Sequence, residues 1–181
     1  MKKWRKVSSE LLLNTPFLRV KRDKVLLPSH QEKEWTYWDS PDSAMVLGIT
    51  QDKKIVMITQ YRYLVGKEVV EFPSGSLHKG EKPAVGARRE FEEETGYRCG
   101  TLISLGAYYE TYGQLNRRIH IFYSEVDRRT TQKLDTGEQG HEEIKVQLVP
   151  IEAAVVMALN NSIDAMGSTL AVLLLKEKLQ I

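Results

Sequence analysis

Residues 75–97 read GSLHKGEKPAVGARREFEEETGY, and this stretch is the most informative part of the chain about its fold. Pro83 suits the first turn of a helix, because its φ is fixed and its missing N–H is not needed there. Gly96 suits the left-handed residue with which many helices end. We therefore predict a helix over residues 83–95 with a loop on either side.

The predicted helix has two faces of different chemistry. At the helical repeat of about 3.6 residues per turn, four side chains share an arc that can enter the core: Ala84, Ala87, Arg88 and Phe91. The opposite arc holds three carboxylates at spacings of three and four: Glu90, Glu93 and Glu94. The pattern predicts one buried face and one face on which three carboxylates converge.

Three carboxylates on one face need compensation. Like charges at this spacing destabilise a helix by roughly 0.2–0.5 kcal/mol per pair, and the negative end of the helix dipole adds to the cost. Mg²⁺ takes oxygen ligands, typically one or two carboxylates with waters and substrate phosphates. Such an ion draws charge off phosphates and helps to make a nucleophile from water. For residues 88–94 alone, a solvated charged face is the competing interpretation.

The complete pattern goes beyond a charged helix. From Gly75 to Tyr97 the chain reads Gly-x5-Glu-x7-Arg-Glu-(apolar)-x-Glu-Glu-x-Gly-(apolar), which resembles the Nudix hydrolase signature at every position. The resemblance implies a pyrophosphohydrolase with the Nudix fold, which is an α/β/α sandwich of class α+β with a mixed β-sheet. It also implies Mg²⁺ or Mn²⁺ as the cofactor.

The same resemblance implies roles for matching residues. Metal ligands or their immediate partners are Glu90, Glu93 and Glu94, and Arg89 is the cation that orients a glutamate. The backbone carbonyl of Ser74 or Gly75 is a further ligand. For Glu81, two interpretations remain open: a structural interaction with the helix N-terminus, or contact with the metal.

Elements outside this stretch follow from hydrophobic patterning and turn residues. We expect strands over residues 17–28, 35–39, 43–50, 54–62, 69–72, 102–109, 118–126 and 144–149. Two helices are expected near the end, over 151–159 and 168–179, with Ser168 as the capping residue of the second. The polar stretch 127–143 is expected to pack poorly. An antiparallel β-region should precede the main sheet.

Composition narrows the protein class. With 181 residues and 41% hydrophobic content, a single domain over 1–181 is expected. The net charge of +2 supplies no broad basic field, so no nucleic-acid polymer is expected as a partner. No apolar run approaches the ~20 residues of a membrane span, so a cytoplasmic protein without a membrane partner is expected. The single cysteine, Cys99, is expected to be a half-buried small hydrophobe.

Residues 60–75 narrow the family further. Gln60-Tyr61-Arg62 and Val70-Glu71-Phe72-Pro73-Ser74-Gly75 are similar to the ADP-ribose pyrophosphatase branch, whose members hydrolyse nucleoside diphosphate sugars. The resemblance implies that Arg62 and Glu71 line the substrate site. It also implies that strands within 1–42 help to build a homodimer, with 43–181 as the catalytic core. The competing interpretations are a strand-end ion pair for Arg62 and a solvated strand face for Glu71.

Other substrate contacts are less sharply defined. Trp38 is a candidate for stacking on a base, although core or interface packing also suits an aromatic ring. Tyr112-Gly113 stands where the branch commonly has Pro-Gly, and we include both residues among the substrate-binding candidates. Asn116-Arg117-Arg118 replaces an acidic residue usual in that branch. Substrates other than ADP-ribose, such as GDP-mannose, therefore remain open.

Hydrolysis also needs a group that deprotonates water. Branch members often draw this base from an acidic loop, and the matching residues here are Glu138, Glu142 and Glu143, with Glu142 as first choice. A solvated loop without a catalytic role is the competing interpretation. The expected reaction is metal-dependent hydrolysis of ADP-ribose to AMP and ribose 5-phosphate. The alternatives are GDP-mannose or a dinucleoside polyphosphate as substrate, or a non-catalytic Nudix-fold ligand sensor.

Overall fold

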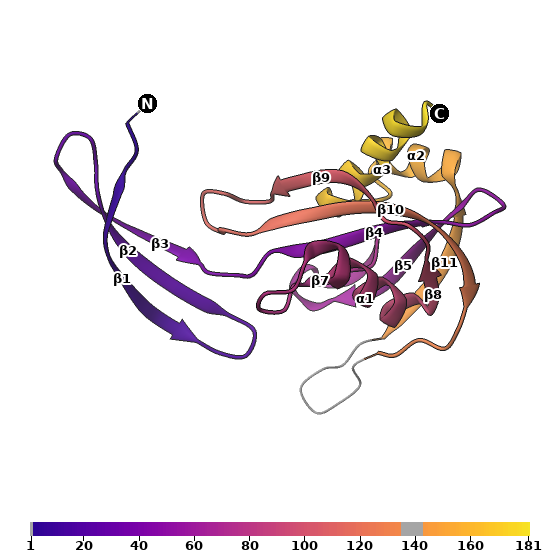
Figure 1. The fold of residues 1–181 in the computed structure, drawn as a ribbon, viewed down its shortest axis with the longest axis horizontal. Helices are drawn as coiled ribbons and strands as arrows, with labels where there is room; N and C mark the ends of the chain where they lie inside the picture. Colours follow the sequence, from indigo (N-terminus) through magenta and orange to yellow (C-terminus); the bar gives the residue numbers. More distant parts are fainter. Residues whose placement is uncertain (1, 135–142) are drawn as a thin grey trace. The chain divides into compact units, whose positions relative to one another are not determined.

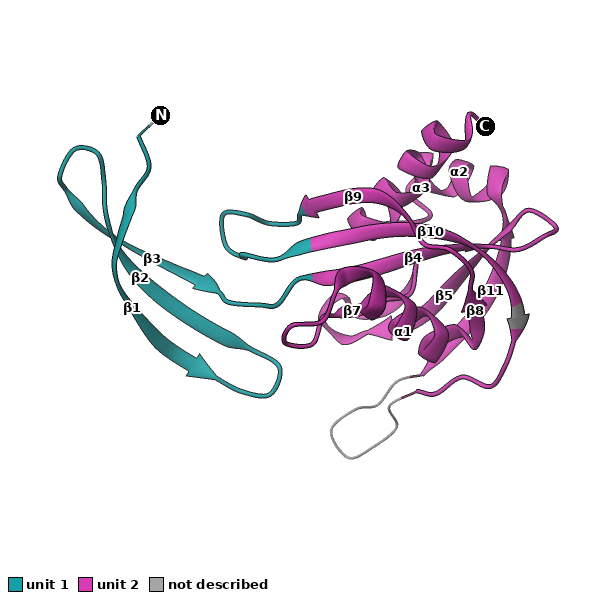
Figure 2. Cartoon of the chain, in the orientation of Figure 1, with its two compact units in different colours: residues 1–42, 109–118 teal, residues 43–108, 119–181 magenta. Residues whose placement is uncertain are grey.

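The structure is a computed structural model, and it describes residues 2–134 and 143–181 (Figure 1). Its internal contacts define two compact units (Figure 2). Unit 1 comprises residues 1–42 and 109–118, and unit 2 comprises residues 43–108 and 119–181.

Unit 1 contains a three-stranded antiparallel sheet in the order β1 (Arg5–Asn14), β2 (Arg19–Leu26) and β3 (Glu32–Trp38). The sequence did not predict β1. All ten residues of this strand are exposed, so its pattern lacks the alternation by which a half-buried strand is recognised. The strand is held by its backbone ladder with β2, a contact that no side-chain periodicity reveals.

Residues 109–118 are joined to the end of β3 by side-chain hydrogen bonds. The Asn116 amide donates to Asp39 at 2.8 Å and accepts from the backbone N–H of Ser40 at 3.0 Å. The Arg118 guanidinium binds the carboxylate of Asp42 at 2.8 Å. Asn116 and Arg118, which depart from the branch pattern, therefore hold unit 1 together.

Unit 2 is built on an eight-stranded mixed sheet. Its main order is β11 (Ile144–Pro150), β5 (Lys54–Arg62), β4 (Ser43–Ile49), β10 (Arg118–Arg129) and β8 (Tyr97–Cys99). The other three strands pair with β5, β4 and β10 respectively: β6 (Lys67–Glu71), β7 (Ser74–Ser76) and β9 (Ile103–Tyr109). Strands β4 and β10 are parallel, whereas β4 and β5 are antiparallel. The mixed sheet expected for this fold is confirmed.

Helices cover both faces of this sheet (Figure 1). Side chains of β4 alternate between two cores, because successive residues of a strand point to opposite faces. Ala44 and Val46 pack with Phe91 of helix α1 (Pro83–Thr95). Met45 and Leu47 pack in the other cluster, with helices α2 (Ile151–Leu159) and α3 (Met166–Leu179). The predicted α/β/α sandwich is confirmed, with α1 as one layer and α2 and α3 as the other.

Two local predictions were wrong. Helix α3 begins at Met166, and Ser168 does not cap it. Instead the Ser168 hydroxyl, 1% exposed, accepts a hydrogen bond from the backbone N–H of Phe72 at 3.0 Å. Strand β10 also continues to Arg129, beyond the predicted end at residue 126. Residues 127, 129–131 and 133 are exposed, as expected, although residues 130–133 bond to the end of α1. Among the described residues, no helix is long and apolar enough to cross a membrane.

Candidate active site

Helix α1 has the predicted boundaries. It begins at Pro83 and ends before Gly96, whose φ of 72° is left-handed and whose N–H bonds the carbonyl of Glu92 at 2.9 Å. A Cβ on Gly96 would also overlap the carbonyl oxygen of Thr130. Glycine is therefore needed here for the backbone conformation and for the close approach of residue 130.

The two faces of α1 differ from the prediction at two residues. Ala87 and Phe91 enter the core, at 1% and 0% exposed, and Glu94 is buried with them at 6%. The reason is helical geometry, since residue 94 follows 91 by three and 87 by seven. Arg88, expected within the core arc, donates to the carbonyls of Cys99 and Gly100 instead. The carboxylates of α1 therefore do not share one solvent face.

Arg89 is the centre of the acidic cluster. Its guanidinium binds Glu90 at 2.8 Å and Glu93 at 3.4 Å through Nη1. Nε and Nη2 each bind the carboxylate of Glu81 at 3.1 Å, and Nη2 also donates to the carbonyl of Ser76 at 3.4 Å. These carboxylates raise the pKa of Arg89, chiefly through the hydrogen bonds to Glu81. One cation thus orients three glutamates.

Glu81 has a structural role in this geometry. The hydrogen bonds from Arg89, followed by one from the backbone N–H of His78 at 2.8 Å, lower its pKa to about 2. Its partner is thus an arginine eight residues ahead in the chain, rather than the N–H groups of the helix N-terminus. The position of Glu81 in the sequence did not identify Arg89 as its partner. Glu81 lies in the loop before the helix, where helical spacing does not apply.

The backbone of strand β7 lies close to the carboxyl group of Glu90. A Cβ placed on Gly75 would overlap the whole carboxyl group of Glu90, so only glycine allows this approach. Ser74 precedes Gly75 in the same strand, which pairs with β4 through Met45 opposite Ser74. The backbone that carries the candidate carbonyl ligand is thereby placed beside a candidate carboxylate ligand.

These residues fit a hard divalent cation. The possible donors are the carboxylates of the cluster and a backbone carbonyl of β7, where Gly75 lies against the Glu90 carboxyl group. Mg²⁺ and Mn²⁺ prefer such oxygen donors. Within residues 2–134 and 143–181, no three histidine, cysteine or acidic side chains form a ready-made metal cluster. Glu90 and Glu93 are instead held by Arg89. A Mg²⁺ site completed by waters and substrate phosphates needs only one or two protein carboxylates.

The predicted substrate residues of unit 2 contact each other. Arg62, at the end of β5, binds one oxygen of Glu71 in β6 at 2.9 Å through Nε and 2.7 Å through Nη2. The side chain of Glu71 is 12% exposed, while that of Arg62 is 45% exposed. The pair leaves the outer part of the guanidinium accessible to a ligand, and it also satisfies the simpler interpretation of a strand-end ion pair.

The remaining substrate candidates belong to unit 1. Trp38 borders a cavity of about 510 Å³, and the Arg117 guanidinium lies 5.7 Å from its ring centroid. Tyr112 and Gly113 border a second cavity of about 320 Å³, and Tyr112 is 85% exposed. An exposed aromatic ring beside a cavity is available for stacking on a planar base.

The candidate base falls largely outside the described residues. Glu142 and Glu138 lie within 135–142, outside the residues that the structure describes. Glu143 is exposed and directly precedes β11. The assignment of Glu142 as general base stays a prediction.

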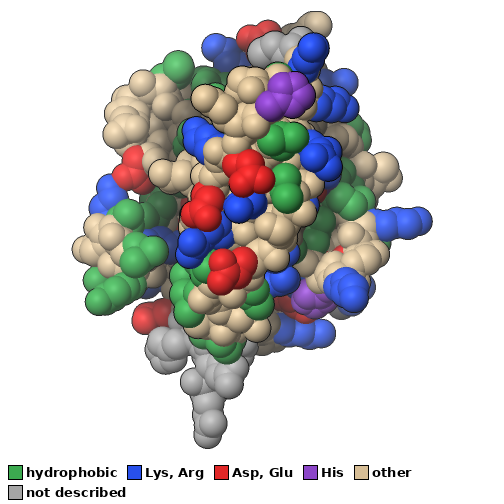
Figure 3. All heavy atoms as spheres, turned by 90° about the vertical axis from the view of Figure 1, so that its left-hand side faces the viewer, with side chains coloured by type: hydrophobic (Ala, Val, Ile, Leu, Met, Phe, Trp, Pro, Cys, Tyr) green, Lys and Arg blue, Asp and Glu red, His purple; other side chains and the backbone are tan. Residues whose placement is uncertain are grey.

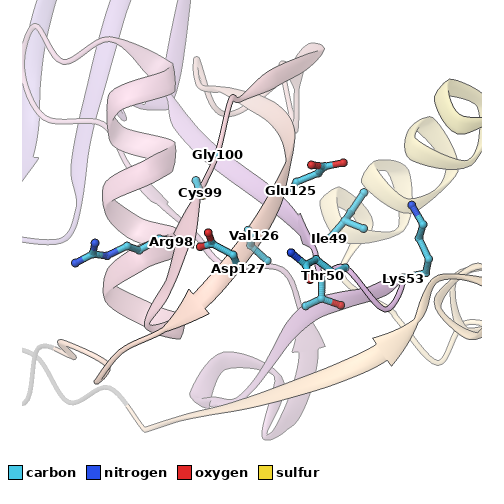
Figure 4. Close-up of a pocket in the computed structure, with 10 residues that line it drawn as sticks. Ile49, Thr50, Lys53, Arg98, Cys99, Gly100, Glu125, Val126 and Asp127 are labelled. Carbon is cyan, nitrogen blue, oxygen red and sulfur yellow. The ribbon is translucent and has the colours of Figure 1, made fainter.

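A separate cavity of about 590 Å³ lies between the turn that joins β4 to β5 and strands β8 and β10 (Figure 4). Cys99 is in its wall, and burial raises the pKa of this thiol to about 12. A thiol with so high a pKa stays protonated and is a poor nucleophile. The expectation of a half-buried small hydrophobe agrees with this environment.

Charge is mixed on the surface. Acidic and basic side chains lie interspersed on the face shown in Figure 3. Opposite charges partly cancel at a distance, and salt screens the remaining field beyond roughly 8–10 Å, so no long-range field of one sign extends from this face.

The α/β/α sandwich and the Arg89–glutamate cluster together are typical of a Nudix hydrolase. Comparisons with known proteins agree with this class. Residues 39–168 match the NUDIX domain family. An ADP-ribose pyrophosphatase of Bacillus subtilis (strain 168) is 30% identical over 176 residues, spanning 96% of this chain and 94% of that protein. A methanol dehydrogenase activator of Bacillus methanolicus is 36% identical over 116 residues, spanning 64% of this chain and 63% of that protein.

The fold is also shared with a solved structure. A crystal structure of an ADP compounds hydrolase superimposes with a TM-score of 0.82 at 17% identity, covering 99% of this chain and 96% of that one. The chain belongs to the NUDIX family, since the family match and the Bacillus subtilis alignment both cover most of its length. It is a Nudix pyrophosphohydrolase of the ADP-ribose pyrophosphatase branch, as its signature and residues 60–75 predict.

Some residues of the site escaped sequence analysis. The Ser76 carbonyl, the Gly75–Glu90 approach and the docking of residues 130–133 on α1 all join segments distant in the sequence. The Gly-x5-Glu spacing did identify Glu81 as part of the pattern, although it did not identify Arg89 as its partner.

Proposed function

We propose that this protein hydrolyses the pyrophosphate bond of a nucleoside diphosphate sugar in a divalent-metal-dependent reaction. The substrate that we propose first is ADP-ribose, which would give AMP and ribose 5-phosphate as products. The observation that carries the proposal is the Arg89 cluster, in which one guanidinium orients Glu81, Glu90 and Glu93. The near full-length similarity to a protein named ADP-ribose pyrophosphatase supports the substrate.

In this proposal Glu90, Glu94 and the Ser74 carbonyl hold Mg²⁺ or Mn²⁺, with Glu93 as a ligand or its partner. When bound, the cation supplies electrostatic stabilisation of the charge that develops on the diphosphate. Arg89 holds Glu90 and Glu93 in place through hydrogen bonds of 2.8 and 3.4 Å. Burial of Glu94 at 6% exposed strengthens its interaction with a cation, because the local dielectric is low.

The reaction is a hydrolytic displacement at phosphorus. Water attacks one phosphorus of the diphosphate, and the bond from that phosphorus to the bridging oxygen breaks. Glu142 accepts a proton from the attacking water, and the bridging oxygen leaves with the other phosphate group. The atoms of one water are thereby divided between the two monophosphate products.

Substrate recognition is assigned to two sets of residues. Arg62 and Glu71 bind the phosphate-proximal part of the substrate, supported by their shared ion pair at a strand end. Trp38, Tyr112 and Gly113 bind the base, supported by the two cavities that they border in unit 1. Neither set specifies adenine over guanine, so GDP-mannose is included in the test below.

A homodimer is part of the proposal. Strand β1 and its flank expose five large apolar side chains in unit 1: Trp4, Val7, Leu11, Leu12 and Leu13. An apolar surface of this kind is typical of a protein–protein contact. Sedimentation equilibrium should give twice the mass of the chain, and a monomer at micromolar concentration would contradict the assignment.

A second function is favoured by one relative. The Bacillus methanolicus protein, 36% identical to the aligned part, is named an activator of another enzyme. This chain would then serve as a regulator, in the form of a non-catalytic Nudix-fold ligand sensor. The intact set Glu90, Glu93 and Glu94 favours catalysis, because a sensor has no need of it.

The test is a phosphate-release screen with Mg²⁺ over ADP-ribose, GDP-mannose, UDP-glucose, diadenosine polyphosphates and nucleoside triphosphates. For substrates without a terminal phosphate, a coupled phosphatase converts the monophosphate products to inorganic phosphate. For the triphosphates, a coupled pyrophosphatase is used instead. Glu94→Gln should reduce turnover by at least about 100-fold, since it replaces a charged ligand with a neutral amide. Glu92→Gln is the matched control on the same helix, because the amide can still accept the hydrogen bond that Cys99 N–H donates.

Two outcomes would contradict the proposal. Inactivity of the unmodified protein on the whole panel would favour the ligand sensor. Unchanged turnover in Glu94→Gln would refute the assigned metal site, even if ADP-ribose were cleaved.

A further inference from the structure

The carbonyl end of α1 is covered by residues 130–133. The last carbonyl groups of a helix lack partners within the helix and need other donors. Here the backbone N–H of Lys133 donates to the carbonyl of Glu93 at 2.8 Å. The Thr130 hydroxyl donates to the carbonyl of Gly96 at 3.1 Å. Residues 130–133 therefore dock on the turn of α1 that carries the candidate metal residues.

Gln132 makes the central contact of this docking. Its side-chain Nε2 donates to the carbonyl of Glu94 at 2.6 Å. The same Nε2 donates to the carbonyl of Ile144 at 3.3 Å. Ile144 is 7% exposed and begins β11, where it pairs with Gln60 of β5. One amide group thus joins three parts of the chain: the end of α1, the segment after β10 and the start of β11.

A simple helix cap does not require this arrangement. One donor satisfies the Glu94 carbonyl, whereas Gln132 divides its two N–H groups between acceptors 50 residues apart in the sequence. The side-chain amide is suited to this task because it carries two donors on one nitrogen. Glutamate has the same shape but only accepts hydrogen bonds when ionised, and methionine has a similar length without a donor.

We propose that Gln132 is a positioning residue of the hydrolytic reaction. It fixes the Glu93–Glu94 turn of α1 relative to the start of β11, and it holds both arms of the chain that lead into and out of residues 134–143. The inference rests on the proposed function, in which Glu93 and Glu94 serve catalysis. Gln132 itself contacts only backbone carbonyls and acts through the residues that it holds.

The effect on kinetics follows from this geometry. A small displacement of a catalytic group mainly affects the transition state, because its stabilisation depends on exact placement. Gln132 binds the carbonyls of Glu94 and Ile144, and among the described residues no hydrogen bond joins it to Arg62 or Glu71, although their ion pair lies near the same end of β5. Loss of the amide donors should therefore lower kcat more than it changes KM.

The experiment compares Gln132→Met and Gln132→Glu with Gln147→Met in the full-length protein. Gln147 is a matched control, because its side-chain amide also donates across β11 and β5, to the Thr59 hydroxyl at 3.2 Å, but does not contact α1. Gln132→Met should lower kcat about tenfold with KM changed less than about twofold, and Gln132→Glu should lower kcat further. Gln147→Met should retain the kcat of the unmodified protein.

Hydrogen–deuterium exchange without metal or substrate gives a readout independent of activity. Peptides that contain Lys133 and Val146 should exchange about tenfold faster in Gln132→Met than in Gln147→Met, because the docking of residues 130–133 is weakened. Equal exchange in both variants would overturn the structural part of the inference. Equal kcat in both variants, with the unmodified protein active, would overturn the positioning role.

The failure of the proposed function is distinguishable from these results. If the unmodified protein cleaves no diphosphate in the screen, the proposed function fails and the positioning role fails with it. If the protein is active and only Gln132→Met and Gln132→Glu lose kcat, both stand. A lower Tm for Gln132→Met with unchanged kcat at 25 °C would reduce Gln132 to a structural residue.

Discussion

The Arg89 guanidinium binds the Glu81 carboxylate through two hydrogen bonds of 3.1 Å each, from Nε to Oε1 and from Nη2 to Oε2. A two-point contact between planar groups fixes the orientation of both. Only Nη1 then remains for the helix glutamates, and it reaches Glu90 at 2.8 Å and Glu93 at 3.4 Å. A residue outside the helix thereby determines how the guanidinium faces the proposed metal residues.

The first prediction concerns Glu81→Gln. The neutral amide cannot make a charge-assisted pair with Arg89, so kcat should fall about tenfold as Glu90 and Glu93 lose their orientation. Stability should show a pH dependence. The pKa of Glu81 is lowered from 4.5 to about 2 in the folded protein, so its contribution is complete above pH 4.5 and disappears as the pH falls towards about 2.

Urea unfolding of Glu81→Gln and the unmodified protein, at pH values between about 7 and 2.5, measures this difference. The gap in unfolding free energy should be largest near neutral pH and shrink in acid. Glu32→Gln, at an exposed carboxylate of β3, serves as the control. A gap that is constant over this pH range would show that the Arg89 pair does not stabilise the fold.

The second prediction concerns Gly75→Ala. The added Cβ would overlap the Glu90 carboxyl group, which must then move away from β7. We expect kcat/KM to fall by roughly 100-fold, the effect of moving a reacting group by about 1 Å. Gly167→Ala is the control, because a Cβ there meets Ile119 at an ordinary contact distance of 3.4 Å. Full activity in Gly75→Ala would mean that Glu90 does not act beside β7.

The third prediction separates substrate binding from a simple ion pair. Arg62→Gln should raise KM for ADP-ribose about tenfold with little change in kcat, because a charged hydrogen bond to substrate is lost before the chemical step. Lys145→Gln is a nearby control, since Lys145 pairs with Glu68 at 2.9 Å between exposed side chains. Such exposed pairs contribute little to stability. If both variants keep the KM of the unmodified protein, Arg62 is only a strand-end ion pair.

The fourth prediction concerns the general base. Glu142→Gln should lower kcat by roughly 100-fold or more and remove the acid limb of the pH–kcat profile, because the amide cannot accept a proton. Glu138→Gln and Glu143→Gln provide matched changes of charge in the same stretch of sequence. A profile that keeps its acid limb in Glu142→Gln, but loses it in either of the others, would move the assignment to that residue.

The fifth prediction concerns Ser168→Ala. The backbone N–H of Phe72 would lose its buried acceptor, at a cost of about 1–3 kcal/mol in unfolding free energy. Because Phe72 directly precedes Pro73 and β7, activity should also become more sensitive to temperature. Ser9→Ala, which removes a hydrogen bond at an exposed position, is the control. Equal midpoints of urea unfolding for the two variants would contradict the prediction.

Features that depend on neighbouring residues were predictable from the sequence. Pro83 and Gly96 bound α1 because each constrains its own backbone, and the observed helix has those limits. Strands β4 and β5 were predicted because both are continuous apolar runs separated by a three-residue turn. The signature, with seven fixed residues and two apolar positions, identified the family, since its spacing reflects one loop and one helix.

Predictions from the sequence failed for strands without a periodic hydrophobic pattern. They also failed for hydrogen-bond partners that are far apart in the sequence. Strand β1 is exposed along its length, and β7 and β8 have only three residues each, so neither alternation nor length identified them. Ser168 resembled a helix cap because serine favours that position, but a buried N–H 96 residues away required its hydroxyl. Local preference gave way to the need to satisfy a buried donor.

The family, the limits of α1 and the presence of Glu90, Glu93 and Glu94 on that helix follow from the amino-acid sequence. The contacts of these residues follow only from the three-dimensional packing. Gly75 approaches Glu90 because β7 pairs with β4, and Gln132 reaches Glu94 because β10 returns the chain to the end of α1. Such contacts depend on how separate segments of the chain pack together. The spacing of residues along the sequence does not specify which segments become neighbours in space.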